Sequence, residues 1–331
     1  MNTLGVGLLG YGSMGKAHAR ALHVLQQLDL PLRPELISIS RSSGEVDWRD
    51  QVADERIGLF LNAGPNALHF EPTVAALRAG KHVLCEKPLG LTAAESRELW
   101  QEAERARVVH LCGFNYRFVP AVRLARELLE AGELGEVVHF RARYLQSWGW
   151  EADPALWRFD RAAAGTGALG DLGAHIVDLA RYLVGEIASV SGRVRAIVPG
   201  REIDDHFVAT VEFENGVLGT LEASRLARGR INNDAFEVNG SKGSVAFDLE
   251  RLNELEVADP NGFRRVLVTE PEHPYLRFWW PPGHTLGWGD TVVNELAYLV
   301  EAIAGEHEVA PHGATFEDGY RCAEVLDAIA G

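Results

Sequence analysis

The first thirty residues contain the feature that most restricts the fold of this chain. Residues 4–9 form a short apolar run that predicts a buried strand, and a helical pattern follows from Lys16 to about Leu28. Between them stands Gly10-Tyr11-Gly12-Ser13-Met14-Gly15. Glycines at this spacing permit a tight turn, close approach of a pyrophosphate to the backbone, and close packing of the helix. The segment therefore predicts a dinucleotide-binding fold in which N–H groups at the helix start bind phosphates.

Strand and helix patterns alternate as far as residue 119. The expected strands are 35–40, 57–62, 82–85 and 108–114, and the expected helices between them are 68–79 and 92–107. This alternation predicts a doubly wound parallel sheet, a Rossmann domain over residues 1–119. A chain of 331 residues exceeds the usual size of one hydrophobic core, so a second domain is expected.

The pattern changes after a helix that runs from Pro120 to about Ala131. The expected strands are 137–146, 188–197, 206–213, 217–224, 235–238 and 244–249, and late helices are expected at 294–304 and 316–330. Asn215-Gly216 and Asn239-Gly240 are hairpin signals. We therefore expect residues 120–331 to form a mainly antiparallel open sheet for substrate binding and oligomerisation. Because exposed apolar faces are rare on monomers, its uncovered face predicts a homodimer or homotetramer.

The composition excludes several classes of protein. The formal charge of −15 and the lack of long basic runs argue against a nucleic-acid partner. No uncharged apolar stretch reaches the length of about 20 residues that spans a bilayer, and the N-terminus has no export signal. Cys85, Cys112 and Cys322 are far apart, which argues against a metal or redox pair and favours reduced thiols in the cytoplasm.

Glu86-Lys87-Pro88 follows the apolar strand 82–85 directly. The carboxyl ends of strands in an open α/β sheet line the ligand crevice, so charged residues there point toward a bound cofactor. A lysine near a nicotinamide ring can lose proton affinity and can donate hydrogen bonds to a reacting hydroxyl, which makes Lys87 a catalytic candidate. The alternative is an ion pair at a strand end with Pro88 forming a turn.

A second candidate constellation opens the helix expected from residue 168 to about 184. Asp171 and His175 are four residues apart and Asp178 follows three later, so a helix would place all three on one face. A dehydrogenase needs a proton acceptor for its alcohol, and a histidine steadied by a carboxylate meets that need. The alternative is that Asp171 caps the helix and His175 packs in the core.

The residues after the second strand bear on cofactor choice. An acidic residue there would bind the 2′-hydroxyl of NAD, but the sequence has Ser40-Arg41-Ser42. Arg41 and the hydroxyls could bind a 2′-phosphate instead, which favours NADP over NAD. The alternative is an exposed arginine at a strand end.

Aromatic residues gather in two stretches, around Trp148, Trp150 and Trp157 and in the segment 275–288, which contains Trp279-Trp280-Pro281-Pro282-Gly283-His284. Flat apolar faces in a glycine- and proline-rich loop suit the C–H surfaces of sugars. Tryptophan is also enriched at subunit interfaces, so a sugar cleft and an interface both remain open from sequence.

Three motifs together resemble the glucose-fructose oxidoreductase, inositol dehydrogenase and rhizopine-catabolism protein family, Gfo/Idh/MocA, over essentially the whole chain. They are the segments 10–15, 80–88, and Trp157-Arg158 followed by 167–175. The resemblance implies that Lys87, Asp171 and His175 form the catalytic set and that the segment with Pro65, Asn66 and His69 is a nicotinamide-side loop. The chain departs from the family at Ser40-Arg41 and in extra residues at 29–34.

The complete set of expected cofactor contacts is Gly10, Tyr11, Gly12, Ser13, Met14, Gly15, Ser40, Arg41, Pro65, Asn66, His69, Glu86, Lys87 and Asn115. The expected substrate contacts are Lys87, Tyr116, Arg117, Trp150, Arg158, Asp171, His175 and His284, and no metal is expected.

The first functional hypothesis is NAD(P)-dependent hydride transfer at a secondary hydroxyl or ketone of a cyclic polyol, sugar or anhydrosugar. Whether Lys87 or His175 accepts the hydroxyl proton stays open at this point. One alternative is a sensor protein that keeps the fold and the cofactor without catalysis, and retention of Lys87, Asp171 and His175 argues against it. Another is a cofactor-assisted glycosidase that turns over without net NAD(P)H.

Overall fold

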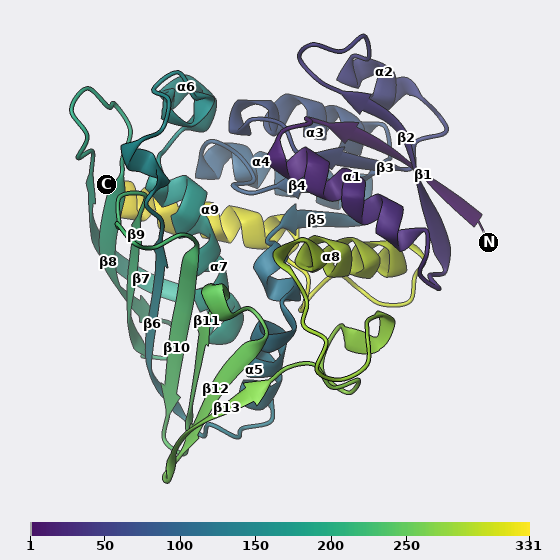
Figure 1. Cartoon of the computed structure of the whole chain (residues 1–331). Coiled ribbons are helices and arrows are strands. Elements are labelled where there is room, and N and C mark those ends of the chain that lie inside the picture. The colour runs from purple at the N-terminus through teal and green to yellow at the C-terminus, as the bar shows by residue number, and fades with distance from the viewer. Residues whose placement is uncertain (1) are drawn as a thin grey trace. The chain divides into compact units, whose positions relative to one another are not determined.

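The structure is a computed structural model that describes residues 2–331. It divides into two compact units. The first contains residues 1–115 and 288–323, and the second contains residues 116–287 and 324–331. This division differs from a single cut after residue 119, because helix α8 (Trp288–Ile303) returns to the first unit and packs along α1 (Ser13–Leu25). Figure 1 shows these two helices side by side.

The first unit is built on a parallel sheet of order β2-β1-β3-β4-β5. Its strands are β1 (Asn2–Leu9), β2 (Leu32–Ser40), β3 (Leu59–Asn62), β4 (His82–Glu86) and β5 (His110–Gly113). Its further helices are α2 (Trp48–Ala53), α3 (Phe70–Arg78) and α4 (Ala93–Ala106), and α9 (Phe316–Ala330) begins here. Because helices pack against both faces, β3 is buried at every position, and the expected Rossmann fold is confirmed.

The extra residues before the second strand lengthen it. Leu32, Arg33 and Pro34 pair with Asn2 to Leu4 at the edge of the sheet. Proline is tolerated there because an edge strand leaves one side of its backbone without a ladder partner. The short helix α2 was absent from the expectations, since six residues give too little periodicity to detect.

The second unit is built on a sheet of order β13-β12-β11-β10-β6-β9-β8-β7. Its strands are β6 (Val137–Leu145), β7 (Ile187–Arg195), β8 (His206–Phe213), β9 (Leu218–Ser224), β10 (Asn233–Gly240), β11 (Ser244–Asp248), β12 (Glu254–Asp259) and β13 (Gly262–Leu267). All neighbours are antiparallel except β6 and β9. The expected mainly antiparallel sheet is confirmed, and β12 and β13 extend it beyond the expected strands.

Helices cover one face of this sheet. They are α5 (Pro120–Glu130) and α7 (Ala174–Leu183), and a short α6 (Arg161–Ala164) lies on the connection from β6 to α7. Buried and exposed residues alternate along β8, as a sheet with one covered face requires. The Asn215-Gly216 hairpin forms as expected, with Gly216 at a φ of 82°.

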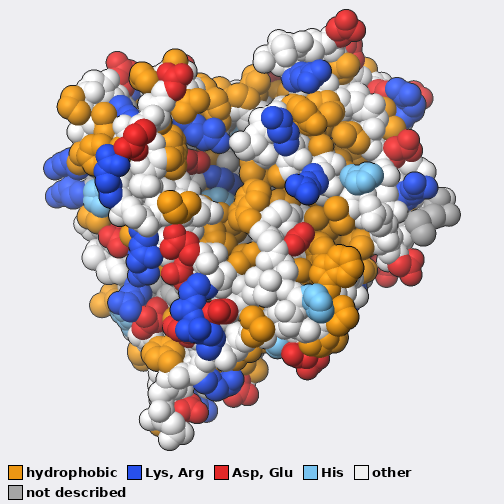
Figure 2. Space-filling view, viewed as in Figure 1, with side chains coloured by type: hydrophobic (Ala, Val, Ile, Leu, Met, Phe, Trp, Pro, Cys, Tyr) orange, Lys and Arg blue, Asp and Glu red, His pale blue; other side chains and the backbone are white. Residues whose placement is uncertain are grey.

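The uncovered face is charged, contrary to the premise that an apolar patch would be exposed there. Arg141 on β6 bonds Glu237 on β10 at 2.5 and 3.2 Å, and Arg265 on β13 lies 3.2 Å from Glu254 on β12. In Figure 2 charges of both signs gather over the part of the sheet formed by β10 to β13. This face forms a hollow of about 830 Å³ whose lining includes Arg143, Arg193 and Arg251.

Two helices have boundaries that differ from those expected from the sequence. Helix α8 begins at Trp288, six residues before the expected start, because the aromatic segment leads directly into it. The expected helix from residue 168 divides into a π-helical turn, Leu169–Gly173, and α7. Within residues 2–331, no helix has both the length and the apolar character needed to cross a membrane.

Candidate active site in two halves

The start of α1 presents backbone N–H groups with no competing side chain. Gly10 has a φ of 89°, and a Cβ there would lie 2.3 Å from the carbonyl oxygen of Ala63, so only glycine fits. A Cβ on Gly12 would meet open space. Gly12 caps α1 without a side-chain hydrogen bond, and the first turn has no acidic residue. This arrangement suits a pyrophosphate, since the helix N-terminus is open and favours negative charge.

The position expected for the adenosine ribose lies where β2 ends. The carbonyl oxygen of Ser40 accepts a hydrogen bond from the N–H of Gly10 at 2.8 Å, and the Ser40 side chain is buried. Arg41 is exposed, and its guanidinium lies 6.0 Å from the centre of the Tyr11 ring. Of the expected 2′-phosphate contacts, Arg41 and Ser42 are exposed whereas Ser40 is buried, and their role stays a prediction.

His69 connects the loops that follow β3 and β4. Its Nδ1 lies 2.7 Å from the carbonyl oxygen of Pro88, and its Nε2 lies 3.1 Å from that of Gly64. The ring is 1 % exposed, and burial lowers the pKa of His69. It thereby holds the loop with Pro65 and Asn66 against the turn after Lys87. A direct cofactor contact by this ring stays a prediction.

Lys87 follows the last residue of β4 and is half-buried. Its neighbour Glu86 is buried, and Glu86 Oε1 lies 2.7 Å from Nε2 of His18 on α1. Asn115, after β5, donates from Nδ2 to Oγ1 of Thr291 on α8 at 2.8 Å. The cofactor roles of Glu86, Lys87 and Asn115 stay predictions.

Asp171 lies in the π-helical turn of the second unit, and an arginine fixes its carboxylate. Arg225 donates to Asp171 Oδ2 at 2.9 Å, and the arginine is 1 % exposed while the Asp171 side chain is 24 % exposed. The Arg225 guanidinium also lies over the rings of Trp148 and Phe159, at 5.0 and 5.9 Å. Asp171 is thus an accessible carboxylate attached to a rigid support. A π turn interrupting a helix often marks a functional site.

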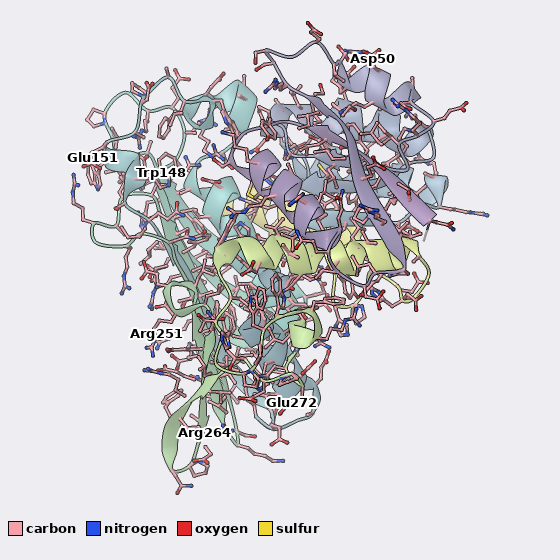
Figure 3. All side chains as sticks on the ribbon, turned by 45° about the vertical axis from the view of Figure 1, so that its right-hand side comes forward. Asp50, Trp148, Glu151, Arg251, Arg264 and Glu272 are labelled. Carbon is pink, nitrogen blue, oxygen red and sulfur yellow. The ribbon has the colours of Figure 1, made fainter. Side chains whose placement is uncertain are left out.

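His175, in the first turn of α7, packs against a wall of aromatic and amide side chains. The ring centres of Tyr116 and Tyr144 lie 4.4 and 5.8 Å from that of His175. Hydrogen bonds between side chains connect these residues in a chain: Tyr116 to Tyr144 (2.8 Å), Tyr144 to Asn232 (2.7 Å), Gln146 to Asn232 (2.6 Å) and Trp148 to Gln146 (2.6 Å). We call these residues, Tyr116, Tyr144, Gln146, Trp148 and Asn232, the polar wall. Figure 3 labels Trp148 at the end of β6, at the opposite end of the sheet from Arg264.

Asp178 and Arg117 form a buried pair beneath this region. The Arg117 guanidinium donates to both carboxylate oxygens of Asp178, at 2.9 and 2.6 Å, and lies 4.8 Å from the centre of the Tyr182 ring. Both side chains are at most 2 % exposed. Arg117 therefore anchors α7, while its expected contact with substrate stays a prediction.

The remaining candidates lie at the margin of the second unit. Trp150 is 42 % exposed and donates to the carbonyl oxygen of Leu226 at 2.8 Å. Arg158 is half-buried and lies over the Trp157 ring at 4.5 Å. His284 is exposed, and its Nδ1 lies 2.8 Å from the carbonyl oxygen of Pro281. Each of these side chains keeps a polar group near the surface, and their contacts with substrate stay predictions.

The candidates fall into two sets by unit. The phosphate-binding turn, His69 and Lys87 belong to the first unit, whereas Asp171 and His175 belong to the second. Within residues 2–331 no cluster of histidine, cysteine or acidic side chains has an arrangement that could hold a metal ion. The first set offers an anion site and an ammonium group, and the second offers a carboxylate and an imidazole beside polar hydroxyl and amide groups.

Sequence reasoning missed most of the polar wall and Arg225. Tyr144 and Gln146 alternate along the end of β6, so their shared direction could have been noticed once that strand was placed. Arg225 and Asn232 lie in the connection between β9 and β10, and only the order of the strands brings that connection beside the end of β6.

Comparison with known proteins gives a consistent result for both units. The family model described as an oxidoreductase family with an NAD-binding Rossmann fold matches residues 4–114, and the one described as the GFO/IDH/MocA C-terminal domain matches residues 122–246. Levoglucosan dehydrogenase from Pseudarthrobacter phenanthrenivorans is 38 % identical, over 99 % of this chain and 96 % of its own length.

Solved structures agree over the same extent. An oxidoreductase domain protein from Kribbella flavida is 42 % identical with a TM-score of 0.95, covering 100 % of this chain and 96 % of that one. A levoglucosan dehydrogenase in complex with NADH is 38 % identical with a TM-score of 0.94, covering 99 % and 96 %.

Proposed function

Since the chain belongs to the Gfo/Idh/MocA oxidoreductase family, with an NAD-binding Rossmann domain, we propose that it transfers a hydride between a nicotinamide cofactor and a secondary hydroxyl or ketone of a cyclic polyol, sugar or anhydrosugar. The observation that carries this proposal is the polar wall beside His175. Hydroxyl and amide groups in a chain of hydrogen bonds, next to the flat rings of Trp148 and Tyr116, match a ligand with several hydroxyls and apolar C–H faces.

Each candidate catalytic residue has a role in this proposal. The bound nicotinamide supplies the hydride acceptor. His175 accepts the proton of the reacting hydroxyl, Lys87 donates a hydrogen bond to the same oxygen, and Asp171, held by Arg225, orients the hydroxyl. A fixed carboxylate and a buried imidazole support these roles because proton transfer requires positioned groups.

We infer a preference for NADP over NAD from the ribose end of β2. The exposed Arg41 and the absence of a carboxylate at Ser40 and Arg41 support binding of a 2′-phosphate. The similar levoglucosan dehydrogenase was solved with NADH, so both cofactors belong in every assay.

The test is a panel of inositols, hexoses and anhydrosugars that includes levoglucosan, with NAD and NADP supplied separately. Absorbance of the reduced nicotinamide should rise with at least one cyclic substrate. Product without net NAD(P)H would instead favour the glycosidase, and cofactor binding without any turnover would favour the sensor.

We also propose a homodimer or homotetramer formed through the uncovered face of the second sheet. Cross-strand pairs such as Arg141 with Glu237 place both signs of charge on this face, so two copies can meet with complementary charges. Light scattering should report a dimer or tetramer that weakens at high salt. A monomer at all salt concentrations would contradict this proposal.

A cytoplasmic location completes the proposal. Cys85, Cys112 and Cys322 are buried thiols, which is typical of proteins in a reducing compartment. Fractionation of cells that express the protein should recover it with cytoplasmic markers.

A further inference from the structure

A buried group of ionisable side chains lies behind the turn that carries Lys87. Glu86 ends β4, His18 lies on α1, and Glu295 lies on α8. Their exposed fractions are 5 %, 0 % and 0 %. We call these three residues the buried acid cluster. It lies entirely in the first unit, and only Glu86, an expected cofactor contact, belongs to the site described above.

The two carboxyl groups of the cluster differ in their hydrogen bonds. Glu86 Oε1 lies 2.7 Å from His18 Nε2, and because an ionised carboxylate can only accept, His18 Nε2 is the donor to the carboxylate form of Glu86. Neither carboxyl oxygen of Glu295 has a hydrogen-bond partner within residues 2–331, and the same holds for His18 Nδ1. Gly113 makes room for the cluster, because a Cβ there would lie 3.1 Å from the Glu86 carboxylate.

An ionised Glu295 would be costly at this position. A buried carboxylate without a cation or hydrogen-bond donor takes up a proton instead of keeping its charge. Burial and the nearby charge of Glu86 both act in this direction and raise the pKa of Glu295 well above its usual value.

The other ionisable groups on the packed elements leave this conclusion unchanged. Lys16, Arg20 and His23 on α1 and Arg33 and Glu35 on β2 are all exposed. Thr291, one turn before Glu295, bonds to Asn115 and is uncharged. Glu86, which His18 binds, is therefore the charged group that acts on Glu295.

We propose that Glu295 is held as a neutral carboxylic acid, and that it and His18 are positioning residues which fix Glu86 and, through the chain, Lys87. With Glu295 neutral, the cluster contains one carboxylate that is bonded to His18. The strand end that carries Lys87 is then anchored from behind. The positioning role rests on the proposed function, whereas the neutral acid does not.

The first experiment tests whether Glu295 is protonated in the folded protein, and it needs neither cofactor nor substrate. Glu295→Gln keeps the shape of a protonated carboxyl, and Glu301→Gln on the same helix is the matched control. For a group whose folded-state pKa is raised, the stabilisation is complete below the unfolded pKa and is lost as pH rises toward the folded pKa. Thermal unfolding midpoints of the unaltered protein should therefore fall relative to Glu295→Gln between pH 5 and 8.

The difference in unfolding midpoint between Glu295→Gln and the unaltered protein should grow by on the order of 2–4 °C per pH unit. This corresponds to about a tenfold change in the folding equilibrium constant per pH unit. Glu301→Gln should follow the unaltered protein. Parallel curves for Glu295→Gln and the unaltered protein would overturn the neutral acid.

The second experiment tests positioning. His18→Phe removes the donor to Glu86, whereas His18→Gln keeps one. We expect His18→Phe to lower kcat about tenfold or more while the cofactor Kd stays within about twofold, and His18→Gln to restore most of the kcat. A merely structural role would lower stability without this selective loss, so equal kcat in the two variants would overturn positioning.

The two failures can be told apart. If the unaltered protein shows no turnover on the substrate panel, the proposed function falls and the positioning role falls with it. The pH dependence of unfolding would still decide the neutral acid separately.

Discussion

The carboxylates around the candidate site residues have different partners in the two units. In the second unit two carboxylates of the candidate site region have an arginine partner: Arg117 binds Asp178 and Arg225 binds Asp171. In the first unit Glu86 is bonded to a histidine, and Glu295 has no hydrogen-bond partner within residues 2–331.

The difference follows from what each unit must bind. Arginine is always charged, so Arg225 is a permanent cationic partner for the part-exposed carboxylate of Asp171. The first unit must accept a polyanion at the start of α1, where further fixed carboxylates would repel it. A neutral acid behind β4 adds no such charge.

The largest expected effect is on the free energy of unfolding, when one buried ionisable side chain is replaced in each unit. Arg117→Met leaves Asp178 charged and unpaired, which should lower the free energy of unfolding by about 3–5 kcal/mol. Glu295→Gln should change it by less than about 1 kcal/mol at pH 5. Urea unfolding measures both. The double variant Arg117→Met, Asp178→Leu should recover much of the loss, and equal losses from the two single variants would remove the contrast between the units.

The second prediction compares one catalytic candidate from each unit. Lys87→Ala and His175→Ala should each lower kcat by about 100-fold or more, because each removes a positioned group for proton chemistry. Both proteins should still bind cofactor, as judged by quenching of tryptophan fluorescence. Lys242→Ala, in an exposed turn of the second unit, is the control and should be unchanged. Near-normal turnover in either variant would remove that residue from the catalytic set.

The third prediction concerns the choice between NADP and NAD by the first unit. NADP should bind more tightly than NAD, and Arg41→Ala should erase or reverse a preference of about tenfold, since one charge-assisted contact to a phosphate is lost. Titration with both cofactors measures this. Tighter binding of NAD by the unaltered protein would end the argument from Ser40 and Arg41.

The smallest expected effect concerns the aromatic loop of the substrate half. Trp280 is 66 % exposed, so it is free to meet either a sugar or another subunit. Replacement of Trp279 and Trp280 by alanine should raise the KM severalfold and leave the oligomer intact, because stacking on one ring contributes about 0.5–1.5 kcal/mol. Loss of the oligomer with an unchanged KM, seen by light scattering and kinetics, would place the loop at an interface.

Sequence alone predicted the elements whose signals are local. The glycines at 10, 12 and 15 lie where the turn and helix require them, and both sheets have the expected class. The position of Lys87 after a buried strand also needed only local pattern.

What sequence could not supply depends on distant contacts. Helix α8 packs against α1, although the two helices are nearly three hundred positions apart in the chain. The hydrophobic periodicity of either helix therefore could not predict that His18 and Glu295 belong to one cluster. Asp178 was expected to share a helical face with Asp171 and His175, and its bond to Arg117, 61 residues away in the chain, could not be read from that spacing. The π-helical turn at Asp171 likewise gave no signal in the sequence, because the expected pattern was one regular helix from residue 168.

The return of α8 also sets an order of events during synthesis. A nascent chain that has emerged only to residue 287 has made all of the second unit except residues 324–331, yet it has α1 without its neighbour α8. Domains usually fold in order from the N-terminus as the ribosome delivers them. Here the amino-terminal unit begins first and finishes late, because α1 lacks its neighbour α8 until residues 288–303 have been synthesised. A ribosome stalled before α8 would hold an unfinished nucleotide fold that is a natural client for chaperones.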